Sequence, residues 1–226
     1  MEHPPLLINI PGIPGYLVYT WIIMGILFAA ALVATRDIKP LPEGIQNFFE
    51  IVVDGIFKFM EDIIGHNSRQ YLPLIGTLAF FILISNLIGL VPGFMSPTNN
   101  INTTAACAII VFFATHYYGV KAHGIGYIKH FFGPIRSVPA IPLMLLMLLL
   151  ELIGHFARVL SLSLRLFGNI FGEDMILIIL AFLIPLLVPL PMMFMAVFTS
   201  VVQTFVFVLL TMIYIKLATE EAEEGH

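Results

Sequence analysis

The sequence predicts an all-α integral membrane protein with five membrane crossings and one amphipathic helix on the membrane surface. Hydrophobic residues make up 59% of the chain, charged residues make up 11%, and the mean hydropathy is +1.00. A soluble domain carries roughly a quarter charged residues. The stretches 70–120 and 175–215 contain no Asp, Glu, Lys or Arg. Each is far longer than the ~20 residues of one crossing and has prolines in its middle, so each predicts two crossings.

The first crossing is predicted at 17–35, where Tyr16, Tyr19 and Trp21 supply the aromatic side chains typical of a membrane interface. Residues 43–64 have a different pattern, with apolar side chains at helical spacing on one face. The charged residues of the other face are Glu50, Asp54, Lys58 and Glu61. This pattern predicts an amphipathic helix that lies flat on the membrane surface, and a helix packed on a soluble partner is the alternative.

The four later crossings are predicted at 71–91, 103–120, 137–184 and 192–215. With the N-terminus outside, the basic residues that border the crossings all fall on the cytoplasmic side. They are Arg36, Lys39, Lys58, Arg69, Lys121, Lys129, Arg136 and Lys216. The two loops left outside, 92–102 and 185–191, contain no Lys or Arg, and the C-terminus is then cytoplasmic. The N-terminal residues resemble neither a signal peptide nor a transit peptide, which favours a bacterial inner membrane protein, all of it one membrane domain (1–226).

The fourth crossing contains five charged residues within an otherwise apolar segment. They are Glu151, Arg158, Arg165, Glu173 and Asp174. An arginine at the bilayer centre costs ~2.5–3.5 kcal/mol on insertion scales, so such residues face protein or water and usually serve transport. We therefore expect an ion pathway here rather than a simple anchor.

The helical period arranges these charges in a stripe. At about 100° per residue, Glu151, Arg158 and Arg165 share one face, which Asn169 extends, whereas the acids at 173 and 174 lie about 80° and 180° round from Arg165. Two acidic ends separated by a fixed positive charge indicate two aqueous half-paths that do not meet. Alternatively, Glu151 and Arg158 form an ion pair that aids insertion, or Arg158 extends to the interface. No acid lies within one turn of Arg165, so its counter-charge is expected on a partner subunit.

Residues 161–169 read Ser-Leu-Ser-Leu-Arg-Leu-Phe-Gly-Asn, which resembles the signature of subunit a of the F-type ATP synthase, the stator subunit of the Fo motor. Four other stretches resemble the same family: 85–92, 97–104, 203–207 and 211–214. The resemblance extends from Trp21 to the acidic tail.

The resemblance implies roles for individual residues. Arg165 is similar to the family's essential arginine, which faces the carboxylate of each c-ring subunit, and Asn169 and Gln203 match positions that help to place it. Asp174 matches the acid of the half-channel open to the outside, and Glu151 matches the acid of the cytoplasmic path.

The resemblance also implies the architecture and the partners. A long tilted helical hairpin, about 137–217, would face the c-ring. The subunit would translocate ions, coupling proton or sodium flow to c-ring rotation and ATP synthesis, without a nucleotide site, cofactor or metal of its own. The expected partners are the c-ring, the subunit b peripheral stalk, the F1 sector and membrane lipid, and no nucleic acid is expected.

One position departs from the family pattern. Many relatives carry His or Glu on the final helix about two turns before the glutamine, where this chain has Ala196. Glu173, beside Asp174, is interpreted as the local replacement. His155 is a possible proton relay on the cytoplasmic path, with a structural hydrogen-bonded histidine as the alternative. A secondary transporter and a structural anchor are the rival functions. The first would require an internal repeat, which the sequence lacks, and the second leaves the arginine stripe unexplained.

Overall fold

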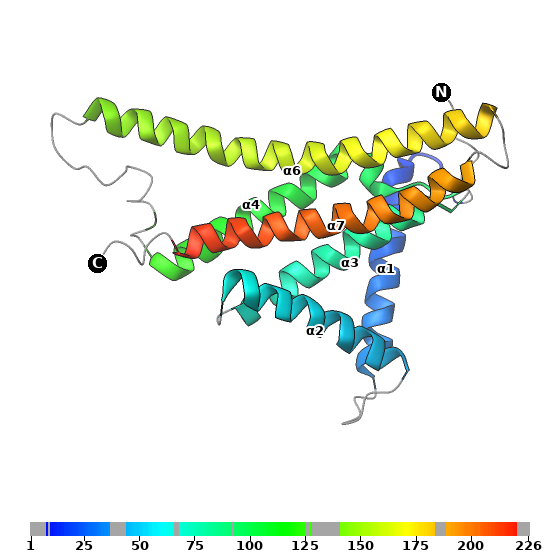
Figure 1. Cartoon of the computed structure of the whole chain (residues 1–226), viewed down its shortest axis with the longest axis horizontal. Helices are drawn as coiled ribbons and strands as arrows, with labels where there is room; N and C mark the ends of the chain where they lie inside the picture. The colour runs from blue at the N-terminus through cyan, green and yellow to red at the C-terminus, as the bar shows by residue number, and fades with distance from the viewer. Residues whose placement is uncertain are drawn as a thin grey trace.

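The computed structural model describes residues 8, 10–36, 44–65, 68–91, 93–124, 127, 141–183 and 189–220, and the elements found in these ranges are all helical (Figure 1). The α-helices are α1 (Gly15–Thr35), α2 (Ile45–Ile64), α3 (Leu72–Ile88), α4 (Ile101–His123), α6 (Ile141–Leu183) and α7 (Pro189–Glu220). Two short 3₁₀ helices, η1 (Ser68–Tyr71) and η2 (Pro97–Asn99), precede α3 and α4. Five helices are long and apolar enough to cross a membrane, so the predicted all-α membrane fold is confirmed.

Two helices extend beyond the predicted crossings. α4 begins at Ile101, because the side chain of Asn100 accepts a hydrogen bond from the backbone N–H of Asn102 at 2.9 Å and caps the helix. α7 continues through Lys216 to Glu220. A lysine marks the membrane edge, but it is a good helix former and does not end a helix. Lys39, Lys129 and Arg136 lie outside the described residues.

The amphipathic helix α2 packs on its own chain. Met60 is fully buried in a cluster with Ile75 of α3 and with Met212 and Ile215 of α7. The charged face points away: Lys58 and Asp54 form an exposed ion pair at 2.8 Å, and this hydrogen bond raises the pKa of Lys58. The inner face of α2 is therefore covered by the helices of this chain rather than left for a soluble partner.

The main core lies where α3, α4, α6 and α7 meet. Its buried residues are Leu78, Ile82, Cys107, Ala108, Val111, Leu162, Leu166, Ile170 and Phe207. Cys107, a free and buried cysteine, is one of them. Three of the nine come from the middle of α6, so this core fixes the rotation of α6 about its own axis and decides which of its residues face out.

The connection between α3 and α4 is held by buried polar side chains. The Ser96 hydroxyl donates to the carbonyl of Ser85 at 2.7 Å, and the Thr98 hydroxyl donates to Oδ1 of Asn86 at 2.6 Å. Tyr19 of α1 donates to the carbonyl of Gly93 at 3.2 Å. Ser96 packs so closely on Gly89 that a Cβ at residue 89 would lie 2.6 Å from its Cβ. These contacts fix the position of η2 against α3.

α6 is longer than one upright crossing requires. Its 43 residues span about 65 Å at 1.5 Å per residue, whereas the hydrocarbon core of a bilayer is about 30 Å thick. Figure 1 shows the axes of α6 and α7 roughly parallel, with the two chain segments running in opposite directions and α1 running across them in this view. If α6 lies in the membrane over its full length, it must therefore be strongly tilted.

Candidate functional site

All five charged residues of the predicted pathway lie on α6, which is one unbroken helix from Ile141 to Leu183. The predicted spacing of the stripe is therefore retained in space. Along the helix the exposure changes: Glu151, Arg158, Glu173 and Asp174 are half-buried, whereas Arg165 and Asn169 are exposed. The two ends of the charged segment thus lie within the protein, and its middle faces outward.

Arg165 points away from the helical core. Its neighbours Leu162 and Leu166 are 2% and 0% exposed and anchor that side of the helix in the main core. On the outer side, Leu164 is exposed beside the arginine. Within the described ranges, Arg165 has no ion pair or hydrogen bond from its side chain. An apolar, exposed helix face with a charge at its centre is arranged for contact with something other than this chain.

Small residues lie along the face of α6 that carries Arg165, beside larger exposed ones such as Leu164. The small residues that share this side of α6 at spacings of three and four are Gly154, Ala157, Ser161, Gly168 and Gly172. A Cβ added at any of the three glycines would meet no atom within 4 Å. Packing inside the chain therefore does not require glycine at these positions. Small residues allow helices to approach closely in a membrane. Sequence reasoning missed this stripe, although its spacing is visible in the sequence.

Asn169 and Gln203 meet across the α6–α7 contact. The Asn169 amide donates to Oε1 of Gln203 at 2.6 Å, although 34 residues separate them. Gln203 is 4% exposed, and its Nε2 has no hydrogen-bond partner among the described residues. The pair lies one turn beyond Arg165 and joins the two helices there.

Asp174 contacts the connection between α3 and α4. Nδ2 of Asn99, in η2, donates to Oδ2 of Asp174 at 2.6 Å. Oδ1 of Asn99 and Oε2 of Glu173 are buried and have no partner in the part of the chain that is described. Buried polar atoms are normally satisfied by protein or water, so this end of α6 suits a hydrated pocket. The sequence had marked Asn99 only as part of a motif, not as a contact of Asp174.

At the other end of the charged segment, Glu151 pairs with His155 and not with Arg158. Oε1 of Glu151 lies 3.4 Å from Nε2 of His155. The Arg158 guanidinium lies 5.4 Å from the centre of the Tyr214 ring of α7. The alternative in which Glu151 and Arg158 neutralise each other is therefore not the arrangement that this structure has.

The site also differs from the family pattern at residue 196, and its described residues contain no cluster of metal-binding side chains. Ala196, where many relatives carry an ionisable residue, is buried at 1% exposure on α7. In the described ranges, no group of three or more His, Cys, Asp or Glu residues is placed to hold a metal ion. The chemistry that these side chains offer is therefore that of charges, amides and imidazole.

Comparison with known proteins gives consistent matches. The family described as the ATP synthase A chain matches residues 17–216. "ATP synthase subunit a 3" of Pelobacter propionicus is 54% identical over 204 residues, which are 90% of this chain and 87% of that protein. The "ATP synthase subunit a" of Trichlorobacter lovleyi is 54% identical over 91% of this chain and 87% of its own length. That of Geobacter sulfurreducens is 53% identical over 90% of this chain and 87% of its own length. This chain therefore belongs to the ATP synthase A chain family.

Proposed function

We propose that this chain is the ion-translocating stator subunit of the Fo sector of an F-type ATP synthase, with Arg165 as its essential residue. The observation that carries the proposal is the exposed guanidinium in mid-helix, which no acid in the described ranges neutralises. An uncompensated arginine in a membrane requires a counter-charge. A carboxylate on a c-ring helix that passes this face is the expected partner.

The small residues around Arg165 support a moving partner. Gly154 before the arginine and Gly168 after it add no side chain to this helix surface, so a partner helix can approach the guanidinium closely. A carboxylate that arrives neutral from lipid is ionised beside Arg165, because an opposite charge nearby favours the charged form. After ionisation it can accept a new proton only from a hydrated path on either side.

The two acidic ends of α6 serve as the two half-channels in this proposal. Asp174, Glu173 and Asn99 line the outer half-channel, and Glu151 lines the cytoplasmic one, with Asn169 and Gln203 placing the arginine between them. Arg165 prevents direct passage between the two. One charge that crosses 100 mV gains ~2.3 kcal/mol, and this energy reaches rotation only if ions cannot bypass the ring.

The proposed complex sets the partners and the orientation. The c-ring covers the exposed α6–α7 face, the subunit b peripheral stalk holds the subunit still, and the F1 sector binds the nucleotides. The subunit lies in a bacterial inner membrane with its N-terminus outside and its C-terminus in the cytoplasm, because this orientation keeps the basic residues inside. α6 and α7 lie tilted along the ring.

The test is Arg165→Ala in the complex reconstituted into liposomes, with ATP-driven pumping and passive ion flux measured separately. Pumping should fall to background, because nothing drives ionisation of the arriving carboxylate. Passive flux should persist or rise, because the barrier between the half-channels is gone. Arg165→Lys should rescue little, since a compact ammonium does not reproduce the planar guanidinium. Arg69→Ala is the matched control, at an exposed arginine in η1 just before α3, and this variant should pump normally.

Normal pumping in Arg165→Ala would overturn the proposal. Co-purification with a ring of small two-helix subunits separates it from the two rivals, since neither a secondary transporter nor a structural anchor requires such a ring.

A further inference from the structure

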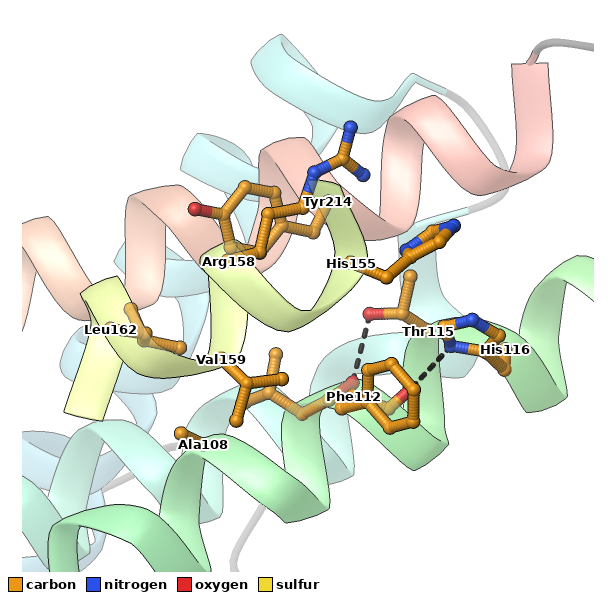
Figure 2. A pocket seen from close by; sticks show the side chains of 10 residues that line it. Ala108, Phe112, Thr115, His116, His155, Arg158, Val159, Leu162 and Tyr214 are labelled. Carbon is orange, nitrogen blue, oxygen red and sulfur yellow. Dashed lines mark hydrogen bonds between the residues drawn. The ribbon is translucent and has the colours of Figure 1, made fainter. Parts of the chain in front are cut away.

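A small cavity lies between α4, α6 and α7 (Figure 2). Its free volume is about 20 Å³, and a cavity needs about 10–15 Å³ by this measure to hold one water molecule. Two histidines border it, His116 from α4 and His155 from α6, together with Thr115, Arg158 and Tyr214. The remaining lining residues are apolar. The cavity therefore has room for one water molecule beside two imidazole rings.

A hydrogen bond indicates which nitrogen of His116 carries the proton of the neutral ring. Nδ1 of His116 lies 2.8 Å from the carbonyl oxygen of Phe112. A carbonyl only accepts, so this nitrogen donates, and Nε2 is the basic nitrogen of the neutral ring. Nε2 of His155 lies 3.4 Å from Oε1 of Glu151. At this distance a protonated His155 can form an ion pair with the Glu151 carboxylate.

The two rings are close enough to share one added proton. Their centres are 4.7 Å apart, and each neutral ring offers one basic nitrogen. A second added proton is opposed by the first and by the fixed charge of Arg158, which borders the same cavity. The other titratable groups nearby are Tyr214 of α7 and Tyr127, whose ring centre is 6.0 Å from that of His116. The pair with its neighbours therefore suits storage of a single proton.

We propose that His155 and His116 form a proton reservoir for Glu151, and that the ion carried by this subunit is accordingly the proton. The inference rests on the proposed function, in which Glu151 lines the cytoplasmic half-channel. Protonated Glu151 gives its proton to His155, leaving a carboxylate beside an imidazolium, and the reverse transfer returns it. The added proton is shared with His116, directly or through the water site. Imidazole changes charge between pH 5 and 8 in its ordinary state, and it does not bind sodium.

The experiment measures passive proton flux through Fo in vesicles whose Glu151 side faces the medium. In weak buffer, His155→Gln should assemble normally but conduct several-fold less than the natural chain, and His116→Gln should show a smaller loss. The natural chain should respond to medium pH between about 5 and 8, whereas the His155→Gln profile should be flat there. High concentrations of a mobile buffer, free imidazole, should restore the variant flux, because the buffer replaces the lost reservoir. His123→Gln, at the end of α4, is the control and should match the natural chain.

Several outcomes would overturn the inference. A His155→Gln flux equal to that of the natural chain in weak buffer would remove the reservoir. A loss that free imidazole does not restore, or failure of both glutamine variants to assemble, would assign the pair a structural role. Flux carried by sodium would also exclude it. Arg165→Ala, measured alongside, separates the two proposals. If Arg165→Ala behaves as expected and the histidine variants do not, the proton reservoir is excluded and the proposed function stands.

Discussion

Arg165 and Asp174 are nine residues apart on one helix, but their surroundings differ. The arginine faces out of the protein without a partner in the described chain, whereas Asp174 accepts a hydrogen bond from Asn99 at 2.6 Å. A carboxylate held by one amide can exchange its proton, and the buried unpaired oxygens of Asn99 and Glu173 are acceptors for water beside it. In the proposed function, these residues would deliver protons to the ring, and Arg165 would promote their release from it.

The first prediction concerns Glu173 and Asp174, two adjacent acids that we expect to replace each other in part. Asp174→Asn and Glu173→Gln should each slow ion-driven ATP synthesis a few-fold. The double change should exceed the product of the single effects by at least about twofold, which corresponds to the ~0.5 kcal/mol lower limit for coupled neighbours. Synthesis rates in inverted vesicles at a fixed proton-motive force measure this. Asn99→Leu should resemble Asp174→Asn, and full activity in the double variant would remove both acids from the pathway.

At the scale of the element, a substitution at a glycine of α6 can test contact with a partner without disturbing the packing of this chain. A Cβ added at residue 168 meets no atom within 4 Å, so we expect Gly168→Leu to leave the fold intact. The added side chain would press on a partner helix, and overpacking costs ~1–3 kcal/mol. Pumping should therefore fall by about tenfold or more, since ~1.4 kcal/mol corresponds to a factor of ten. Gly25→Leu, at an equally open site on α1, is the control.

This glycine prediction is measured as pumping beside the thermal stability of the purified subunit. Unchanged pumping in Gly168→Leu would argue against a partner helix at this face. Loss of stability in the same variant would mean that the residue packs inside the chain after all.

The contact between the end of α3 and the connection that follows it includes a glycine, Gly89, that the packing of this chain does require. A Cβ at Gly89 would lie 2.6 Å from Cβ of Ser96 and 3.3 Å from its backbone nitrogen, and Ser96 is held by Ser85. Gly89→Ala should therefore destabilise the subunit by ~1–3 kcal/mol, as overpacking does. Gly76→Ala, in open space on the same helix, should be neutral or stabilising by up to ~1 kcal/mol. Thermal unfolding in detergent compares the two, and equal midpoints would refute the argument.

The helical period predicted which residues share one face of α6, but it did not predict which residues of other helices contact that face. The order of charges along α6 and the outward direction of Arg165 both follow from sequence spacing and an apolar flank. The hydrogen bond from Asn99 to Asp174 joins residues 75 positions apart, and no pattern within one segment specifies it. The resemblance to a known family linked Asn169 with Gln203, but it did not indicate the direction of their hydrogen bond. Packing between helices depends on side-chain shape at the contact, which composition and period do not encode.

At the scale of the whole molecule, this multi-pass membrane protein has two distinct ends. At one end, Asn102 at the start of α4 donates to the hydroxyl of Tyr16 at the start of α1 at 3.3 Å. At the other, Lys121 near the end of α4 donates to Gln70 before α3 at 3.4 Å. The count of five long apolar helices was predictable, because it is a property of composition along the chain. The tilt of α6 stays a prediction from the family resemblance, and the unbroken length of 43 residues is consistent with it.

The last prediction tests this arrangement with single cysteines. Cys107 is buried at 4% exposure, so the natural chain should resist a membrane-impermeant maleimide from either side. In a Cys107→Ser background, Lys121→Cys should react only in inside-out vesicles, because positive residues remain cytoplasmic. Asn102→Cys, exposed at the opposite end of α4, should react only in right-side-out vesicles. Labelling of both positions from one side would mean that α4 does not cross the membrane. If each position reacts from the side opposite to the expected one, the subunit has the reverse orientation in the membrane. Glu151 would then lie on the outer path, and the two half-channels would be exchanged.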